Sequence, residues 1–345
     1  MKIIALEEAF SVEGLERVPK TNEWPIPIDP KIMETWTKRL RDFEEWRLPE
    51  MDAHGVTIHV LSLTAPGIQA VPDAPTALGN AKKANDYLAA VIAKHPDRFV
   101  GFTALPLQDP KAAVQELNRC VRKLGFFGAL VNDHTLGHYL DEPQFGPLWQ
   151  ALTDLQVPLY IHPGAPPLDR WNVLNGYPEL TAASWAWQAQ VGGHALRLIH
   201  GGVFDRFPTA KVILGHMGEF LPFQLWRFDS RYRTMKEQNL ERLPSEYFGR
   251  NIFITTSGVF SPSVLAGAVM AMGEDSVLFA IDYPYESTEE AVSFLNSAPL
   301  SRVAREKIAG LNAERLLRIQ SHSNGSASGN SPALKSARTS AGGNR

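Results

Sequence analysis

The stretch KVILGHMGEFLPFQLWRFDSRY, residues 211–232, holds one complete unit of the predicted fold. Its aliphatic start, Lys211 to Leu214, predicts a short strand that is buried on both faces. From Pro222 to Tyr232 the apolar residues recur at the spacing of an amphipathic helix. His216 follows the strand directly. The unit is therefore a strand, a polar turn and a helix.

The same unit recurs along the chain. Seven further apolar runs, bounded by Gly, Pro, Asn or Asp, predict strands, and a helical pattern follows most of them. These strands are Ile3–Leu6, His59–Leu63, Phe99–Leu105, Gly128–Val131, Pro158–Ile161, Ile252–Thr255 and Val277–Ala280. The other predicted helices are Leu78–Lys94, Pro110–Leu124, Gln144–Leu155, His194–Phe204, Pro262–Met272 and Thr288–Ser297. Such alternation implies a parallel sheet that helices cover.

The number of strands predicts an α/β fold, a closed (β/α)₈ TIM barrel of one domain over residues 1–319. An open doubly wound sheet is the competing architecture, and it would carry a Gly-rich phosphate-binding turn after its first strand. Glu7, Glu8, Ala9 and Phe10 occupy that place instead. The closed barrel is therefore the prediction.

Two segments lie outside the repeating pattern. Residues 11–42 contain four prolines together with Trp24 and Trp36. We interpret this segment as a long insertion after the first strand, which covers the barrel mouth or reaches a neighbouring subunit. Residues 320–345 are rich in Ser, Gly and Asn, and their composition predicts a disordered tail.

Composition excludes several classes of function. The chain has 34 basic and 37 acidic residues, a net charge of −3 with no concentrated basic face, so nucleic acid is not an expected partner. Apolar runs are too short for a membrane span or a signal peptide. Cys120 is the single cysteine and has no partner for a disulfide. A cytoplasmic protein is the expectation.

Polar residues follow most of the predicted strands, at the end of a barrel where active sites are built. A lone Glu or His at a strand end is commonly an ordinary hydrogen-bonded residue. A carboxylate, two imidazoles and a second carboxylate on four strands are harder to explain in that way, and these groups bind divalent metals. The metal-site candidates are Glu7, His162, His216 and Asp282, and Thr64, Asn132, Asp133, Thr256 and Ser257 also follow strands.

Local motifs narrow the prediction further. They are LEEAF (6–10), LSLTAPG (61–67), GALVND (128–133), YIHPG (160–164), HALRLIHGGVFDRFP (194–208), ILGHMGEFLPFQLWRFD (213–229), ITTSG (254–258) and AIDYPYES (280–287). In this order they resemble the non-oxidative benzoic-acid decarboxylases of the amidohydrolase superfamily, the group of γ-resorcylate, 2,3-dihydroxybenzoate and salicylate decarboxylases. The resemblance extends from Met1 to about Ile319 and does not specify the substrate.

The resemblance implies one divalent metal per subunit, held by Glu7, His162 and Asp282. Bacterial relatives often have a histidine two residues after the first glutamate, whereas this chain has Ala9. Two carboxylates and one imidazole leave coordination positions open for a bidentate substrate. Zn²⁺ is the expected ion, and the oxygen-rich set also suits Mg²⁺ or Mn²⁺.

The resemblance also suggests how the reaction proceeds. An ortho-hydroxybenzoate can chelate the metal through its carboxylate and its phenolic oxygen. Asp282 is the expected proton donor to the ring carbon. His216 and Glu219 are expected to form a pair next to the substrate, although Glu219 could instead only charge the start of the following helix.

Further residues are expected to bind the substrate or to support this pair. They are Trp24, Thr64, Pro66, Arg227 and Tyr283, with Arg227 paired to Glu219 or Asp229. The products would be a phenol and CO₂, and carboxylation is the reverse reaction. The apolar insertion and the resemblance together predict a homo-oligomer, a dimer or tetramer.

Two alternatives stay open on the sequence alone. A metal-dependent hydrolase of a lactone or amide would use the same ligands. The chain lacks the H-x-H pair after its first strand and an obvious bridging lysine, which weighs against that class. A catalytically inactive barrel that serves as a binding scaffold is disfavoured because the four metal-binding side chains are retained.

Overall fold

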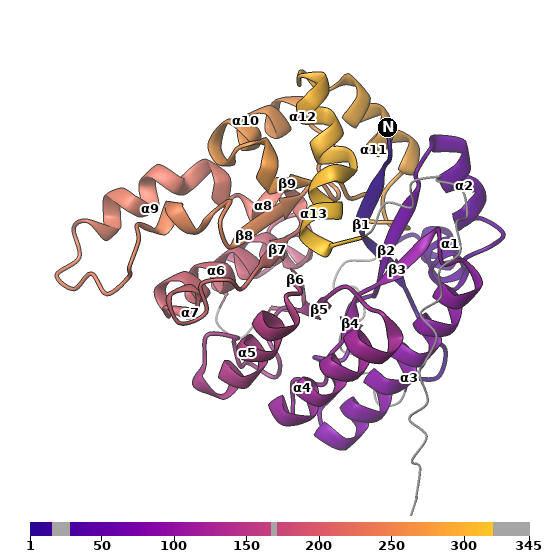
Figure 1. Ribbon diagram of the computed structural model, residues 1–345, viewed down its shortest axis with the longest axis horizontal. Coiled ribbons are helices and arrows are strands. Elements are labelled where there is room, and N and C mark those ends of the chain that lie inside the picture. The colour runs from indigo at the N-terminus through magenta and orange to yellow at the C-terminus, as the bar shows by residue number, and fades with distance from the viewer. Residues whose placement is uncertain (16–27, 167–170, 320–345) are drawn as a thin grey trace, which may run out of the picture.

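A computed structural model describes residues 1–15, 28–166 and 171–319 of the protein (Figure 1). The strands are β1 (Ile4–Phe10), β2 (Ile58–Leu63), β3 (Phe99–Gly101), β4 (Thr103–Ala104), β5 (Ala129–Asn132), β6 (Leu159–His162), β7 (Val212–Leu214), β8 (Ile252–Thr255) and β9 (Val277–Leu278). Trp24 and the predicted tail, residues 320–345, lie outside the described residues.

Helices alternate with these strands. They are α1 (Pro30–Arg41), α2 (Arg47–His54), α3 (Ala74–Lys94), α4 (Pro110–Arg119), α5 (Gly146–Leu155), α6 (Ala186–His200), α7 (Val203–Arg206), α8 (His216–Glu219), α9 (Leu225–Tyr232), α10 (Pro262–Met272), α11 (Thr288–Ser297), α12 (Arg302–Glu306) and α13 (Asn312–Leu317). Short 3₁₀ turns join several of them, and single π turns follow α4 (Cys120–Leu124) and α12 (Lys307–Leu311). None of the helices in the described ranges has the length and apolar character that crossing a bilayer requires.

All strand pairs are parallel, in the orders β1-β2-β3 and β4 through β9. The predicted third strand is divided at Phe102, whose backbone N–H donates to Leu61 of β2 at 2.9 Å. At the other edge, Leu6 of β1 donates to Phe279, which follows β9, at 3.1 Å. These hydrogen bonds join the two sheets at both edges, and the predicted TIM barrel is confirmed.

The barrel interior is filled by strand side chains rather than open. Tyr160 and Phe102 pack there among aliphatic residues that include Ile4, Leu6 and Ile213. The helices lie outside the strands, as Figure 1 shows. Two larger apolar clusters pack between strands and helices. Because the interior is a packed core, chemistry is confined to the barrel's ends.

Helix boundaries follow local capping. α10 and α11 begin and end as predicted, and Ser287 caps α11 by accepting from the backbone of Glu290 at 3.2 Å. α6 begins earlier than predicted, at Ala186 instead of His194, so His194 is internal to the helix. α9 begins at Leu225 because a 3₁₀ turn precedes it.

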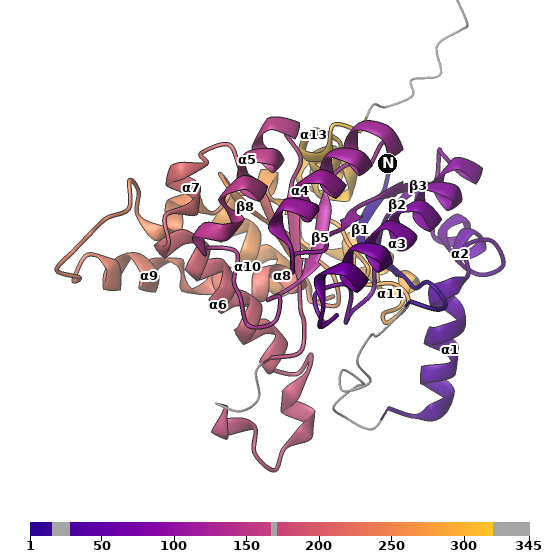
Figure 2. The ribbon, with the colours of Figure 1, turned by 90° about the horizontal axis from the view of Figure 1, so that it is seen from below.

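The described part of the insertion lies against the loop after β9. Asp29 caps α1 by accepting from the backbone of Lys31 at 2.8 Å, and Pro30 opens the helix. The ring of Trp36 meets the ring of Tyr285 edge-on, with centroids 5.1 Å apart. α1 and the segment before α6 extend from the same side of the molecule in Figure 2. The insertion therefore borders the barrel mouth.

Candidate active site

Glu7 lies within β1, not after it as the sequence suggested, because the strand continues to Phe10. The register between β1 and β2 shifts between Ala5 and Glu8, so the strand contains an irregularity at Glu7. Glu7 has a φ of 81°, a left-handed conformation that is costly for a residue with a side chain. A bulge of this kind redirects a side chain near an active site.

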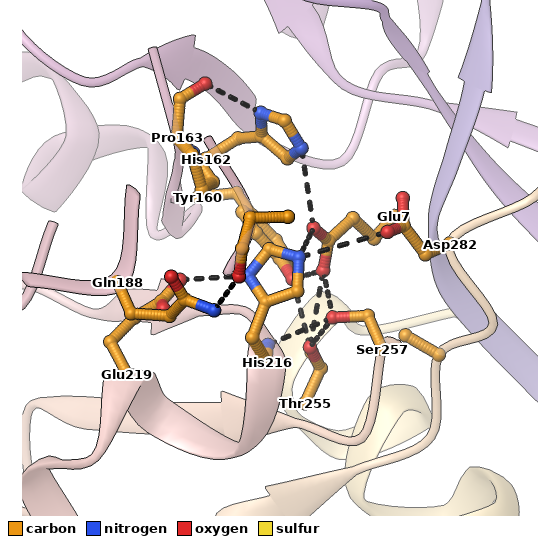
Figure 3. Close-up of polar contacts among 12 residues, drawn as sticks. Glu7, Tyr160, His162, Pro163, Gln188, His216, Glu219, Thr255, Ser257 and Asp282 are labelled. Carbon is orange, nitrogen blue, oxygen red and sulfur yellow. Dashed lines mark hydrogen bonds and ion pairs between the residues drawn. The ribbon is translucent and has the colours of Figure 1, made fainter. Parts of the chain in front are cut away.

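The two carboxylate oxygens of Glu7 have different surroundings (Figure 3). Oε2 accepts hydrogen bonds from the hydroxyls of Tyr160, Ser257 and Thr255. Oε1 is buried and has no hydrogen-bond partner among the described residues. A buried oxygen left unpaired costs about 1–3 kcal/mol, so Oε1 is suited to an additional ligand.

His162, at the end of β6, presents one nitrogen to Glu7. Its Nε2 lies 3.5 Å from Oε1 of Glu7. Its Nδ1 lies 3.0 Å from Oδ1 of Asn132 and 2.8 Å from the carbonyl of Pro163. Both partners accept, so Nδ1 carries the proton and Nε2 keeps its lone pair. Burial lowers the pKa of His162, which also favours the neutral imidazole.

His216 follows β7 and approaches Glu7 from another side. Its Nε2 lies 3.4 Å from Oε1 of Glu7, and its Nδ1 lies 2.8 Å from Oε1 of Glu219. Burial opposes a charge on this imidazole, but the negative charges of Glu219 and Glu7 outweigh burial and raise its pKa well above the usual value. Burial also raises the pKa of Glu219, although His216 opposes that shift. The predicted His216–Glu219 pair is present.

The ligand atoms of Glu7, His162 and His216 all lie within 4.8 Å of one another. Asp282 reaches this group through His216, with its Oδ2 3.7 Å from Nε2. One carboxylate oxygen and imidazole nitrogens form a donor set that binds divalent transition metals. The four candidates from the sequence therefore meet at one end of the barrel. His216 is close enough to bind the ion, although the ligand set implied by the resemblance is Glu7, His162 and Asp282.

Backbone conformations with positive φ are concentrated in and next to the metal-binding group. Asp133, His216 and Asp282 have φ values of 55°, 47° and 78°, and Glu219 has 53°. Non-glycine residues in this region persist only where their surroundings hold them, and they are common at functional sites. The concentration of strain at strand ends agrees with the position of the metal-binding group.

The residues expected at the substrate have different outcomes. Thr64 borders a small cavity with Glu7, His162 and Asp282, and its hydroxyl lies 2.6 Å from that of Tyr285. Pro66 is partly buried just beyond Thr64. Tyr283 does not line this cavity; it is fully buried, with the guanidinium of Arg47 4.3 Å above its ring. Tyr285 is the tyrosine that borders the cavity.

The expected pairing of Arg227 is wrong. Glu219 is paired with His216, and Asp229 accepts from the backbone and hydroxyl of Ser245 at 2.9 and 2.7 Å. Arg227 is exposed on α9. The spacing in WRFD brings Arg227 and Asp229 close in sequence, but residues two apart on a helix do not face each other.

Tyr160 and Glu8 also belong to this region, and neither was predicted as a site residue from the sequence. Tyr160 lies inside a strand, and its hydroxyl donates to Glu7 and lies 2.8 Å from Thr255. Burial and the nearby charge of Glu7 raise the pKa of Tyr160 well above its usual value, so the hydroxyl keeps its proton. A period of two along β6 places Tyr160 and His162 on the same face, and that spacing could have indicated it.

His194 is the first histidine of the motif at residues 194–208. It is buried inside α6, and its Nδ1 lies 2.9 Å from Oδ1 of Asp133. Its Nε2 accepts from the backbone of Leu140 at 3.0 Å. Both nitrogens are therefore used by structural hydrogen bonds, and His194 is not available to a ligand.

Comparison with known proteins assigns the family. The amidohydrolase family model matches residues 19–319. The chain belongs to the amidohydrolase family. This amidohydrolase is 41% identical over 328 residues to the γ-resorcylate decarboxylase of a Rhizobium species, an alignment that covers 92% of this chain and 98% of the relative.

Two solved structures are also similar to this amidohydrolase. One is a 2,6-dihydroxybenzoate decarboxylase in complex with 2,6-dihydroxybenzoate, with 40% identity and a TM-score of 0.86, covering 92% of this chain and 100% of the other. The second is a dihydroxybenzoic acid decarboxylase of a Polaromonas species with bound manganese and the inhibitor 2-nitroresorcinol, with 38% identity and a TM-score of 0.86, covering 92% and 97%. These relatives support the decarboxylase prediction and not the hydrolase alternative.

Proposed function

We propose that this member of the amidohydrolase family is a non-oxidative decarboxylase that depends on a divalent metal. Its proposed substrates are ortho-hydroxybenzoates such as 2,6-dihydroxybenzoate, 2,3-dihydroxybenzoate or salicylate. The observation that carries the proposal is the buried Oε1 of Glu7. It accepts no hydrogen bond from the described residues and faces the Nε2 atoms of two histidines beside Asp282. The γ-resorcylate and dihydroxybenzoate decarboxylases named above support this class of substrate. The products are the phenol and CO₂.

Glu7, His162 and Asp282 are the proposed metal ligands. His162 has neutral partners at Nδ1, an amide oxygen and a carbonyl, so its Nε2 lone pair is free to bind a cation. His216 has the carboxylate of Glu219 at Nδ1, which stabilises a proton on the imidazole. We therefore assign His216 to the substrate rather than to the ion. The bound ion supplies positive charge that orients the substrate's carboxylate and phenolic oxygens.

The proton transfer is assigned to Asp282. If CO₂ left the aromatic ring directly, an unstabilised aryl anion would remain. The ring carbon that bears the carboxylate must therefore receive a proton first. Asp282 donates that proton, the carbon–carbon bond breaks, and its electron pair returns to the ring as CO₂ departs. Glu219 holds the ring of His216 at 2.8 Å, in position to hydrogen-bond the phenolic oxygen.

The identity of the ion, the assembly and the compartment belong to the same proposal. Zn²⁺ is our first choice, and Mn²⁺, which a Polaromonas relative contains, and Mg²⁺ are the alternatives. We propose a homo-oligomer, a dimer or tetramer, to which the insertion of residues 11–42 contributes. A buried, reduced Cys120 is compatible with the proposed cytoplasmic location.

The substrate pocket is proposed to include Thr64, Pro66 and Tyr285, with Trp24 as a further contributor. Thr64 and Tyr285 form a hydroxyl pair at the edge of the cavity that Glu7, His162 and Asp282 line. Such a pair can accept or donate a hydrogen bond to a ring hydroxyl. Arg227 remains a substrate-binding proposal without a partner in the described ranges.

Incubation with hydroxybenzoates tests the proposed function. The protein is first freed of metal with a chelator and then reconstituted with Zn²⁺, Mn²⁺ or Mg²⁺ in turn. Each sample is mixed with 2,6-dihydroxybenzoate, and formation of the phenol and CO₂ is followed by NMR. We expect turnover only with metal, and none with benzoate, which lacks the ortho-hydroxyl group that closes the chelate. In deuterated water, deuterium should appear on the carbon that carried the carboxylate. Full turnover by the metal-free protein would refute the metal-dependent mechanism.

A further inference from the structure

Glu8, next to the metal-binding Glu7, is a fully buried carboxylate with a different set of contacts. Its Oε1 accepts from the backbone N–H of Ile281 at 3.0 Å. Its Oε2 accepts from the backbone N–H of Tyr283 at 3.2 Å. These two N–H groups belong to the residues on either side of Asp282. One carboxylate therefore spans the backbone of the proposed proton donor.

The backbone at Asp282 needs such support. Its φ of 78° lies in the left-handed region, which side-chain-bearing residues adopt only when neighbouring contacts hold them. The backbone N–H of Ala9, one residue beyond Glu8, also donates to the carbonyl of Tyr283 at 2.8 Å. Three hydrogen bonds thus hold the segment around Asp282 against β1: Glu8 accepts two of them and Ala9 donates the third.

Arg47 of α2, which is also buried, contacts the same two segments, β1 and the backbone around Asp282. Its guanidinium lies 4.3 Å from the centre of the Tyr283 ring, and its Nη2 donates to the carbonyl of Ala9 at 2.5 Å. Burial raises the pKa of Glu8 to about 8, and the hydrogen bond from Ile281 and the positive charge of Arg47 oppose that shift. The backbone around Asp282 is therefore held by a buried hydrogen-bond acceptor, Glu8 of β1, and a buried cation, Arg47 of α2.

We infer that Glu8 is a positioning residue for Asp282: through the two flanking backbone N–H groups it fixes the donor carboxyl relative to Glu7 of β1. The inference rests on the proposed role of Asp282 as proton donor. Adjacent glutamates then have separate functions: Glu7 binds the ion, and Glu8 holds the backbone from which Asp282 extends. A purely structural role in closing the barrel is the competing explanation.

The first test is Glu8→Gln in the metal-loaded full-length protein. The amide nitrogen of Gln cannot accept a hydrogen bond, so one of the two flanking N–H groups loses its partner. We expect kcat to fall by about tenfold to a hundredfold, because a displacement of ~1 Å of a reacting group has effects of that size. KM for 2,6-dihydroxybenzoate and metal content should change little. Hydrogen exchange of peptides that contain residues 281–283 should accelerate.

A double-mutant cycle separates positioning from a structural role. If Glu8 acts through Asp282, adding Glu8→Gln to Asp282→Asn should cause no further loss of kcat, since the group being positioned is already absent. Multiplicative losses in the double variant would overturn the inference. An unchanged kcat of Glu8→Gln would do the same.

Glu116→Gln is the matched control. Glu116 is also a buried carboxylate held by several donors, among them Asn85 at 2.8 Å and Arg119 at 2.6 Å, but it lies on α4 outside the site. It should lower the melting temperature and leave kcat unchanged well below that temperature. If Glu8→Gln does not fold, Glu8→Asp, which withdraws the carboxylate by one methylene, should show the same loss confined to kcat, and a wild-type kcat would refute the inference.

Wild-type turnover separates this inference from the proposed function. If the wild-type protein releases no CO₂ from any ortho-hydroxybenzoate, the proposed function fails. In that case hydrogen exchange of residues 281–283 in Glu8→Gln still tests whether Glu8 holds the backbone on either side of Asp282. If the wild type turns over and Glu8→Gln is equally active, only the positioning role fails.

Discussion

Nδ1 of His216 lies 2.8 Å from Oε1 of Glu219, three residues further along the chain. The contact depends on an unusual backbone, because His216 and Glu219 both have positive φ values, 47° and 53°. Glu219 is 1% exposed, so its charge is screened little by solvent. The pair therefore fixes both the orientation and the charge of the imidazole that faces Glu7.

Glu219→Gln should reduce kcat by about tenfold to a hundredfold, a range typical of a lost orienting partner. Gln can still accept from Nδ1, but it removes the negative charge that favours a protonated imidazole. Steady-state kinetics with the metal-loaded enzyme measures the effect. Glu142→Gln is the control, because Glu142 makes a similar contact, 2.8 Å, with the exposed His138. Equal losses in the two variants would contradict a specific role for Glu219.

His162→Ala and His216→Ala should have different effects on metal binding. Loss of His162 removes a proposed ligand and should weaken metal affinity by more than about tenfold, whereas loss of His216 should spare the metal and reduce kcat by about a hundredfold. Metal titration followed by elemental analysis distinguishes the two variants. If His216→Ala loses the ion as readily, His216 is a metal ligand and its assignment to the substrate is wrong.

Asp282→Asn separates metal binding from proton transfer. Asn keeps an oxygen that can bind the ion and nearly the same volume, but it cannot deliver a proton to a ring carbon. Turnover should fall by about two to four orders of magnitude, the range usual for a general acid, while the metal and 2-nitroresorcinol remain bound. Single-turnover kinetics places the loss in the chemical step. Near-normal turnover would reassign the proton to His216 or to water.

Ala9→His should tighten metal binding. Ala9 and Glu7 line the same small cavity as His162, two residues apart on β1, so an imidazole at this position can reach the ion. We expect metal affinity to rise by at least about tenfold, since even outer partners of a metal site contribute that much. Competition with a chelator measures it. Ala9→Leu, which adds volume without a ligand, should not tighten binding, and an unchanged affinity in Ala9→His would place residue 9 outside the metal's reach.

Much of the fold was predictable from local patterns. The aliphatic runs that predict strands overlap every strand of the barrel, and α10 and α11 have the predicted bounds. Helix and strand periodicity depend on neighbouring residues only, so they can be read without knowledge of the fold. The division of the third strand at Phe102 was not predictable, because it depends on a hydrogen bond to Leu61, far away in sequence.

The residues of the site were predictable as a set, and their contacts were not. Parallel strands bring their carboxyl ends together, so Glu7, His162, His216 and Asp282 had to meet once a barrel was assumed. Which atoms face one another depends on side-chain direction. The left-handed backbone at Glu7 and the exposure of Arg227 are such details, and each left a prediction in error.

The sequence by itself determined the barrel, the end at which chemistry occurs and the donor types available to a metal, because these follow from local periodicity and residue chemistry. Only the tertiary structure decided that Tyr283 is buried under Arg47 while Tyr285 borders the site, and that Glu8 holds the backbone around Asp282. Those relationships join segments more than 200 residues apart, and they arise when β1 closes the barrel beside the last strand. No local pattern records them, since the free energy of each contact depends on a partner that only the closed fold brings near.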